Sequence, residues 1–203
     1  MTAREQKGAW RRRLLAARRA QPPELRAARG AALAAAVVEL ARAIGPAGTL
    51  VCAYLPVRTE PAWAGGLDGL RAAGYDVLLP VVPPVRGPLE WARYLGADAL
   101  AAGPVGLLEP TGPRLGPAAV ARAGLVLVPA LAADRRGVRL GQGGGYYDLT
   151  LPLADPATPL VVVLNDEELV DELPAEPHDR RVNAALLAER GMTRLGDSVE
   201  GRR

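Results

Sequence analysis

The sequence has 203 residues, a length that suits one ordinary domain, with 49% hydrophobic and 23% charged residues, as in average soluble proteins. The formal net charge of +3 is too small to indicate nucleic-acid binding. One cysteine (Cys52), one histidine (His178) and one serine near the C-terminus (Ser198) exclude a disulfide and a cysteine-based zinc site and disfavour a Ser-His-Asp triad. An enzyme of this composition must use carboxylates, arginines, its one lysine, backbone amides or a cofactor.

The chain lacks the apolar segments of membrane and secreted proteins. No run approaches 18 apolar residues, and the arginine-rich N-terminus has no apolar centre of a signal peptide. We therefore expect a cytoplasmic protein without a membrane partner.

Two helices are predicted before the first strand. The first spans residues 2–19, with a narrow apolar stripe of Trp10, Leu14 and Leu15 and arginines on its other faces. The second starts after Pro22-Pro23 and reaches about Ile44, where Gly45-Pro46 ends it.

Apolar runs that predict buried strands alternate with helical segments along the rest of the chain. The strands are expected at residues 49–54, 76–82, 124–128 and 159–164, with a shorter one at 89–95. Helices are expected at residues 61–73, at 117–122 and directly after a glycine loop at 141–145. This alternation predicts an α/β fold, a three-layer αβα sandwich with a mostly parallel central sheet. We expect residues 1–195 to form a single domain and residues 196–203 to form a flexible tail.

The segment with the strongest chemical signal is residues 137–148, Gly-Val-Arg-Leu-Gly-Gln-Gly-Gly-Gly-Tyr-Tyr-Asp. Its glycines can present consecutive backbone N–H groups to phosphate oxygens. It is not a P-loop, because no Gly-Lys-Ser/Thr follows, and Tyr146 breaks the dinucleotide fingerprint. A flexible loop is the alternative, but the flanking Arg139 and Asp148 favour phosphate and its magnesium ion.

The string from Arg139 to Asp148 resembles the Arg-Leu-Gly-x-Gly-x-Gly-Tyr-Tyr-Asp signature of the 5-formyltetrahydrofolate cyclo-ligase family. Further similarities are found at Lys7 with Arg11, in the Gly103–Pro110 segment, at 128–132 and at 177–179. The resemblance covers roughly residues 5 to 190, in order and without a large gap.

The resemblance implies an ATP-driven cyclisation that needs no protein nucleophile. The formamide oxygen of 5-formyltetrahydrofolate attacks the γ-phosphate of ATP and gives a phosphorylated imidate. The N10 amine then attacks the activated carbon, and phosphate leaves to give 5,10-methenyltetrahydrofolate. The implied co-substrate is ATP, the implied metal ion is Mg²⁺, and the enzyme's task is to position the substrates and stabilise charge.

The resemblance also assigns roles to particular residues. The ATP contacts map onto Lys7, Arg11, Arg139, Leu140, Gly141, Gln142, Gly143, Gly144, Gly145, Tyr146 and Tyr147. The folate contacts map onto Leu55, Glu60, Gln142, Gly143, Gly144, Gly145 and Tyr146, and magnesium maps onto Asp148 and Asp179. Arg139, Tyr146 and Glu60 are the expected catalytic residues.

Some assignments stay open. Glu60 could accept hydrogen bonds from folate N–H groups or hold the N10 amine. Trp91 and Tyr94 could stack on the pterin, although aromatic residues on a strand more often belong to the core.

Two rival classes remain. One comprises sugar-phosphate isomerases and CoA transferases, which would leave Lys7, Arg11 and the glycine string unexplained. The other is a nucleotide- or RNA-binding module derived from the same family, without turnover. For the favoured reading we expect small-molecule substrates, no nucleic-acid partner and a monomer.

Overall fold

The computed structural model describes residues 2–176 and 179–196, apart from the side chain of Val105. His178, Ser198 and almost all of the predicted tail lie outside the described residues. The α-helices are α1 (Ala3–Ala20), α2 (Pro23–Ile44), α3 (Gly65–Ala72) and α4 (Tyr146–Thr150). Short 3-10 helices occur at Ala97–Ala99, Pro104–Gly106, Pro117–Arg122, Leu151–Leu153 and Asp166–Glu168.

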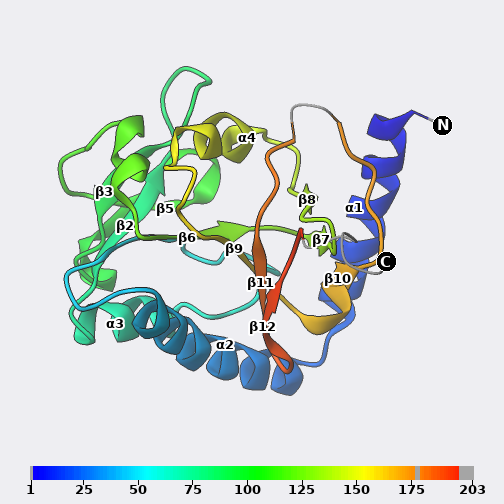
Figure 1. The fold of residues 1–203 in the computed structure, drawn as a ribbon, viewed down its shortest axis with the longest axis horizontal. Helices are drawn as coiled ribbons and strands as arrows, with labels where there is room; N and C mark the ends of the chain where they lie inside the picture. Colours follow the sequence, from blue (N-terminus) through cyan, green and yellow to red (C-terminus); the bar gives the residue numbers. More distant parts are fainter. Residues whose placement is uncertain (1, 177–178, 197–203) are drawn as a thin grey trace, which may run out of the picture.

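A seven-stranded sheet forms the centre of the molecule (Figure 1), in the order β12-β11-β9-β6-β1-β2-β3. Its strands are β1 (Leu50–Cys52), β2 (Asp76–Val81), β3 (Glu90–Arg93), β6 (Leu125–Pro129), β9 (Leu160–Leu164), β11 (Ala184–Leu187) and β12 (Gly191–Arg194). The five inner strands are parallel, and the two edge strands β12 and β3 run antiparallel to their neighbours. The predicted mostly parallel sheet is therefore confirmed.

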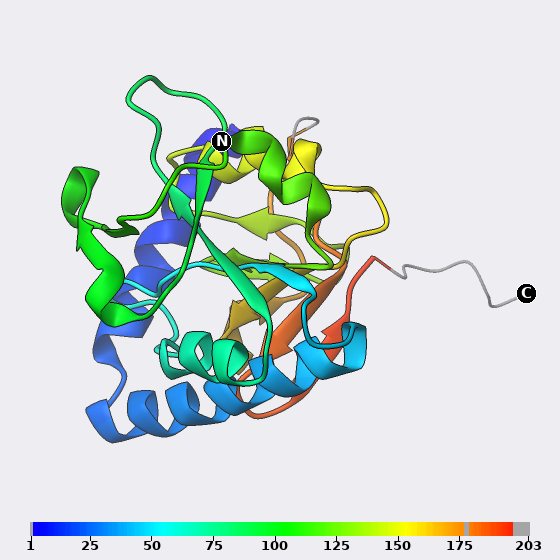
Figure 2. The same ribbon diagram turned by 90° about the vertical axis from the view of Figure 1, so that its left-hand side faces the viewer.

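Each face of this sheet has its own apolar core, because successive side chains of a strand point to opposite faces. Val51 and Ala53 pack with α2 and α3 in one cluster. Cys52 lies in the other cluster with Val120 and Leu151 from the short helices. Figure 2 shows α2 passing beneath the sheet, opposite α4 and the short helices, so the three-layer αβα arrangement is confirmed.

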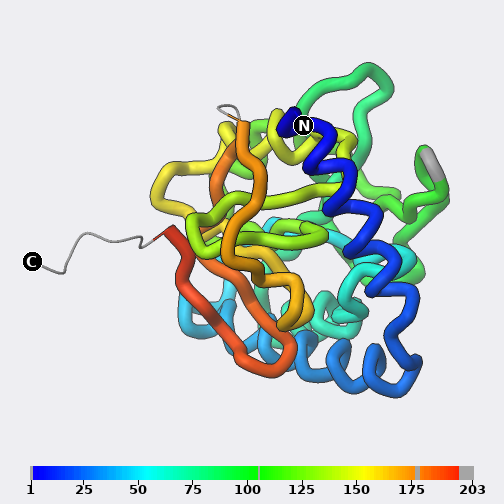
Figure 3. Tube along the Cα trace, turned by 90° about the vertical axis from the view of Figure 1, so that its right-hand side faces the viewer, coloured from blue at the N-terminus to red at the C-terminus, as the bar shows by residue number. Residues whose placement is uncertain are grey.

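A smaller sheet of three strands supports α1. It consists of β10 (Leu169–Val170), β7 (Ala132–Asp134) and β8 (Arg139–Leu140), in that order. Leu14 of α1 packs against Leu131, Val138 and Leu173 in a third apolar cluster. Figure 3 shows α1, in blue, running beside the yellow-green segment that carries β7 and β8. A hairpin of β4 (Leu100–Ala102) and β5 (Leu108–Pro110) completes the strands.

Both long helices match their predicted positions, whereas the helix expected at 61–73 begins only at Gly65. The side chain of Cys52 is wholly buried, and burial raises the pKa of its thiol to about 12. At neutral pH the thiol is therefore protonated, which agrees with its exclusion as a nucleophile. Within the described residues, no helix combines the length and the apolar character that a bilayer crossing requires.

Candidate functional site

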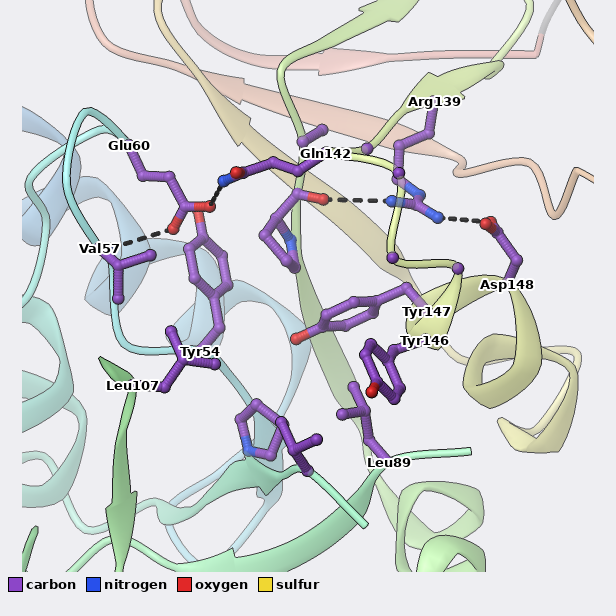
Figure 4. A pocket seen from close by; sticks show the side chains of 18 of the residues that line it. Tyr54, Val57, Glu60, Leu89, Leu107, Arg139, Gln142, Tyr146, Tyr147 and Asp148 are labelled. Atoms are coloured by element: carbon purple, nitrogen blue, oxygen red, sulfur yellow. Dashed lines mark hydrogen bonds and ion pairs between the residues drawn. The ribbon is translucent and has the colours of Figure 1, made fainter. Parts of the chain in front are cut away.

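A cavity of about 960 Å³ lies where the inner strands β1, β2 and β6 end. Tyr54 follows β1, Val82 follows β2, and Ala130 follows β6, and all three line the cavity. The carboxyl edge of parallel strands is the usual position of ligands in such sheets. Residues of α1 and of the glycine loop also line the cavity, so its walls come from widely separated parts of the chain (Figure 4).

The glycine loop presents free backbone donors to this cavity. Gly143 has φ +106° and Gly145 has φ +73°, left-handed conformations that favour glycine. No described residue accepts a hydrogen bond from the backbone N–H groups of residues 142–145. The helix α4 that follows has only five residues, so its dipole adds little. The loop amides can therefore donate hydrogen bonds to a ligand, and the oxygens of a phosphate group would accept them.

Arg139 lies next to Gly141 of the loop and is only 8% exposed. Its Nη2 donates to Oδ1 of Asp148 over 2.5 Å, and its guanidinium lies 5.8 Å from the ring centre of Tyr147. The Nε atom is buried and has no hydrogen-bond partner in the described structure. A Cβ atom at Gly141 would come within 2.8 Å of Nη1 of Arg139, so a larger residue there would displace the guanidinium. Arg139 thus combines a fixed position with an unused donor.

Helix α1 brings two more cations to the cavity. Arg11 donates from Nε to the carbonyl oxygen of Gly141 over 2.9 Å. The ammonium group of Lys7 lies 2.7 Å from carboxylate oxygens of both Glu176 and Asp179. Burial would lower the pKa of Lys7, but its hydrogen bonds to Asp179 and Glu176 outweigh this effect and raise the pKa. Lys7 is therefore a permanent positive charge at the cavity wall.

Glu60 is a buried carboxylate on the opposite wall (Figure 4). Its Oε2 accepts from the backbone N–H of Val57 over 3.1 Å, and its Oε1 accepts from Nε2 of Gln142 over 2.8 Å. Burial raises the pKa of Glu60 above its ordinary value despite these two hydrogen bonds. Gln142 belongs to the glycine loop, so Glu60 is tied directly to the proposed phosphate-binding segment.

Tyr54 and Tyr147 also place buried hydroxyl groups at the cavity. The hydroxyl of Tyr147 has no protein partner in the described structure, whereas Tyr54 lies beside Trp63. Burial raises the pKa of both phenols, so both stay protonated at neutral pH. An unpaired buried hydroxyl costs free energy, which a polar ligand atom could recover. The hydroxyl of Tyr147 is therefore a candidate ligand donor or acceptor.

The structure brings the predicted site residues to one cavity. Its lining includes Lys7, Arg11, Leu55, Glu60, Arg139, Leu140, Gly141, Gln142, Gly143, Gly144, Gly145, Tyr146, Tyr147, Asp148 and Asp179. The side chain of Leu140 packs in the cluster under α1, so its role there is structural.

The stacking considered for Trp91 and Tyr94 is wrong. Trp91 is wholly buried in one core cluster and Tyr94 is buried in the other. Neither residue lines the cavity. Strand β3 lies at the sheet edge, and both aromatic rings fill the space between the sheet and its covering segments.

Sequence reasoning did not assign a site role to several residues that line the cavity, among them Arg4, Arg58, Arg86 and Glu109. Arg58 has φ +54°, a conformation that non-glycine residues adopt mainly at functional or strained positions. An isolated arginine in a loop carries no sequence signal, but Glu109 belongs to the Gly103–Pro110 segment and could have been noticed there.

The donor set is compatible with magnesium held partly by phosphate. No group of three or more His, Cys, Asp or Glu residues suited to a metal ion occurs in the described part of the chain. Magnesium bound to a nucleotide commonly needs only one or two protein carboxylates and keeps its phosphate and water ligands. Asp148 and Asp179 both line the cavity and meet this lesser requirement.

The fold of the chain is shared with two solved structures. A 5,10-methenyltetrahydrofolate synthetase from Aquifex aeolicus matches with a TM-score of 0.77 and 22% identity, over 97% of this chain and 96% of that one. A synthetase of the same name from Mycoplasma pneumoniae matches with a TM-score of 0.70 and 18% identity, over 88% of this chain and 96% of that one. At these identities the likeness establishes the fold.

Sequence comparison establishes the family. A protein named 5-formyltetrahydrofolate cyclo-ligase from Mycolicibacterium smegmatis is 43% identical over 152 residues, which are 73% of this chain and 78% of the relative. A protein of the same name from Escherichia coli is 33% identical over 56% of this chain and 63% of the relative. The model of the 5-formyltetrahydrofolate cyclo-ligase family matches residues 3–188. The chain therefore belongs to the 5-formyltetrahydrofolate cyclo-ligase family.

Proposed function

We propose that the protein converts 5-formyltetrahydrofolate and ATP into 5,10-methenyltetrahydrofolate, ADP and phosphate. The observation that carries this proposal is the set of N–H groups at residues 142–145, which have no partner in the described structure and share the cavity lining with Arg11 and Arg139. These donors form an anion-binding surface at one end of a cavity whose lining also includes prolines and leucines. Such a cavity suits a reaction in which a triphosphate and a flat heterocyclic substrate are bound side by side.

In the proposed reaction the formyl oxygen attacks the γ-phosphorus, and the bond from that phosphorus to the ADP oxygen breaks. The loop amides and Arg139 would stabilise the charge on the transferring phosphoryl group. Lys7 and Arg11 would hold the triphosphate from the other side. The product of this step is a phosphorylated imidate of the folate.

In the second step the N10 amine attacks the imidate carbon and closes the ring. The N10 proton is lost, and phosphate departs with the former formyl oxygen. Glu60 accepts a hydrogen bond from Gln142 of the loop. This position would allow the Glu60 carboxylate to hold the folate near the reacting carbon. Tyr146 lines the same part of the cavity and would orient the substrate.

Magnesium, when bound with ATP, would neutralise phosphate charge. Asp148 and Asp179 would be its protein ligands in this proposal. Asp148 also pairs with Arg139, and Asp179 also pairs with Lys7, so each carboxylate lies beside a proposed phosphate-binding cation.

The reaction is tested by absorbance at the methenyl-folate band with purified protein, 5-formyltetrahydrofolate, ATP and Mg²⁺. We expect absorbance to rise only in the complete mixture and to stay flat when any one component is omitted. ATP binding without a rise in absorbance would contradict the proposal and favour a nucleotide-binding module without turnover.

Substitution of Arg139 tests the phosphate-binding end. Arg139→Ala should lower kcat about 100-fold or more, because it removes a charged transition-state contact. The control is Arg135→Ala, since that side chain is 66% exposed, lies outside the cavity lining and pairs only weakly with Asp171 over 3.5 Å. Steady-state kinetics of both variants provide the readout, and equal activity of the two would remove Arg139 from the mechanism.

Substitution of Glu60 tests the folate-binding end. Glu60→Ala should weaken 5-formyltetrahydrofolate binding about tenfold or more, because a buried charged acceptor is lost, and should leave ATP affinity within about twofold. Titration calorimetry with each ligand separately measures both effects. Glu39→Ala serves as the control, because the Glu39 side chain is 69% exposed on α2. Equal weakening of both ligands by Glu60→Ala would contradict the assignment.

A further inference from the structure

Glu109 is a second buried carboxylate of the cavity, and the proposed reaction gives it no role. It lies on β5, is only 8% exposed and lines the cavity. Its Oε1 accepts from the backbone N–H of Val82 over 2.8 Å. The described structure gives its Oε2 no donor and no salt bridge, and this oxygen is not among the unpartnered atoms that are sealed from solvent. Oε2 is therefore available to a ligand.

The other buried carboxylates among the described residues are better satisfied. Asp134 accepts three backbone N–H groups and pairs with Arg136. Glu168 pairs with Arg18, and each oxygen of Glu60 accepts one hydrogen bond. A buried carboxylate is costly unless it is paired or well hydrogen-bonded. The single donor to Glu109 leaves capacity for further N–H groups.

The segment around Glu109 is built to leave room for its carboxylate. A Cβ atom at Gly103 would lie 2.6 Å from Cδ and 2.8 Å from Oε2 of Glu109. Gly103 has φ −101°, which any residue can adopt, so its backbone conformation does not require glycine. The close approach of Glu109 is thus the reason for glycine at position 103, and it explains one residue of the Gly103–Pro110 segment.

The position of Glu109 sets the kind of ligand group that it can bind. In 5-formyltetrahydrofolate the formyl group and the N10 amine lie on one side of the bicyclic ring, and the 2-amino group with the adjacent ring N–H lies at the far end. A formyl oxygen directed at the glycine loop therefore directs the 2-amino edge away from it. Glu109 comes from β5, which packs beside β2 on the side of the cavity formed by Pro83 and Leu107.

We propose that Glu109 recognises the 2-amino pyrimidine edge of the folate, accepting its N–H groups on the free carboxylate oxygen. This inference rests on the proposed function. Each carboxylate oxygen has two lone pairs, so Oε2 can accept from the 2-amino edge while Oε1 keeps the hydrogen bond from Val82. Glu109 then determines substrate specificity at the end of the cavity opposite the reacting atoms, and Glu60 serves the reacting end.

The test compares the affinity of 5-formyltetrahydrofolate with that of its analogue carrying methyl in place of the 2-amino group, by titration calorimetry without ATP. The wild-type protein should prefer the amino compound about tenfold or more. Glu109→Gln can keep the hydrogen bond from Val82 while replacing the free oxygen with an NH₂ group, so its preference should fall to about twofold or less.

Two glycine-to-alanine variants test whether the position of the Glu109 carboxylate matters when the carboxylate itself is kept. Gly103→Ala should also reduce the preference, because the new Cβ atom displaces the flexible end of Glu109. Gly112→Ala is the control, because its Cβ atom would meet nothing within 4 Å, and it should keep the wild-type preference.

The outcomes distinguish this inference from the proposed function. Full preference for the amino compound in both Glu109→Gln and Gly103→Ala would overturn the inference alone. Preference lost in Glu60→Gln but kept in Glu109→Gln would also overturn it and assign the 2-amino edge to Glu60. A wild-type protein that does not bind 5-formyltetrahydrofolate would instead overturn the proposed function, and with it this role of Glu109.

Discussion

The docking of α1 onto the small sheet is the interaction on which the site depends. Arg18 of α1 is 2% exposed and donates to both carboxylate oxygens of Glu168, over 2.6 and 2.8 Å, and to the carbonyl oxygen of Ala130. Removal of one partner of such a buried pair typically costs about 3–5 kcal/mol. The same helix carries Arg11 to the glycine loop and Lys7 to the cavity wall. A buried ion pair therefore fixes the position of the cations at the cavity.

The cavity walls have distinct chemical characters. Cations from α1 and from β8 gather around the unpartnered loop amides, whereas prolines and leucines line the side near β2 and β5. Glu60 and Glu109 are the buried carboxylates of this lining. The concentration of cations near the loop, and of prolines and leucines near β2 and β5, would orient a ligand that carries phosphate beside a ligand with a flat ring.

The sequence predicted those parts of the fold whose signal is local. The apolar runs at residues 124–128 and 159–164 form β6 and β9, and the glycines at 141–145 form the loop at the cavity. The small sheet was not predicted, because β8 and β10 have only two residues each and depend on pairing with β7. The pairing of Arg18 with Glu168 joins residues 150 positions apart, and no local pattern distinguishes Arg18 from its neighbouring arginines. For Trp91 the sequence left ligand stacking open beside the more usual core position, and its tertiary packing shows that it belongs to the core.

Transfer of the formyl oxygen to phosphate is the central chemical claim. It can be measured with 5-formyltetrahydrofolate carrying ¹⁸O in the formyl group, ATP, Mg²⁺ and the purified protein, followed by mass spectrometry of the released inorganic phosphate. Attack of the formyl oxygen on the γ-phosphorus predicts that the label appears in the inorganic phosphate. Unlabelled phosphate, with the label recovered in water, would contradict the phosphorylated imidate and the role of the glycine loop in forming it.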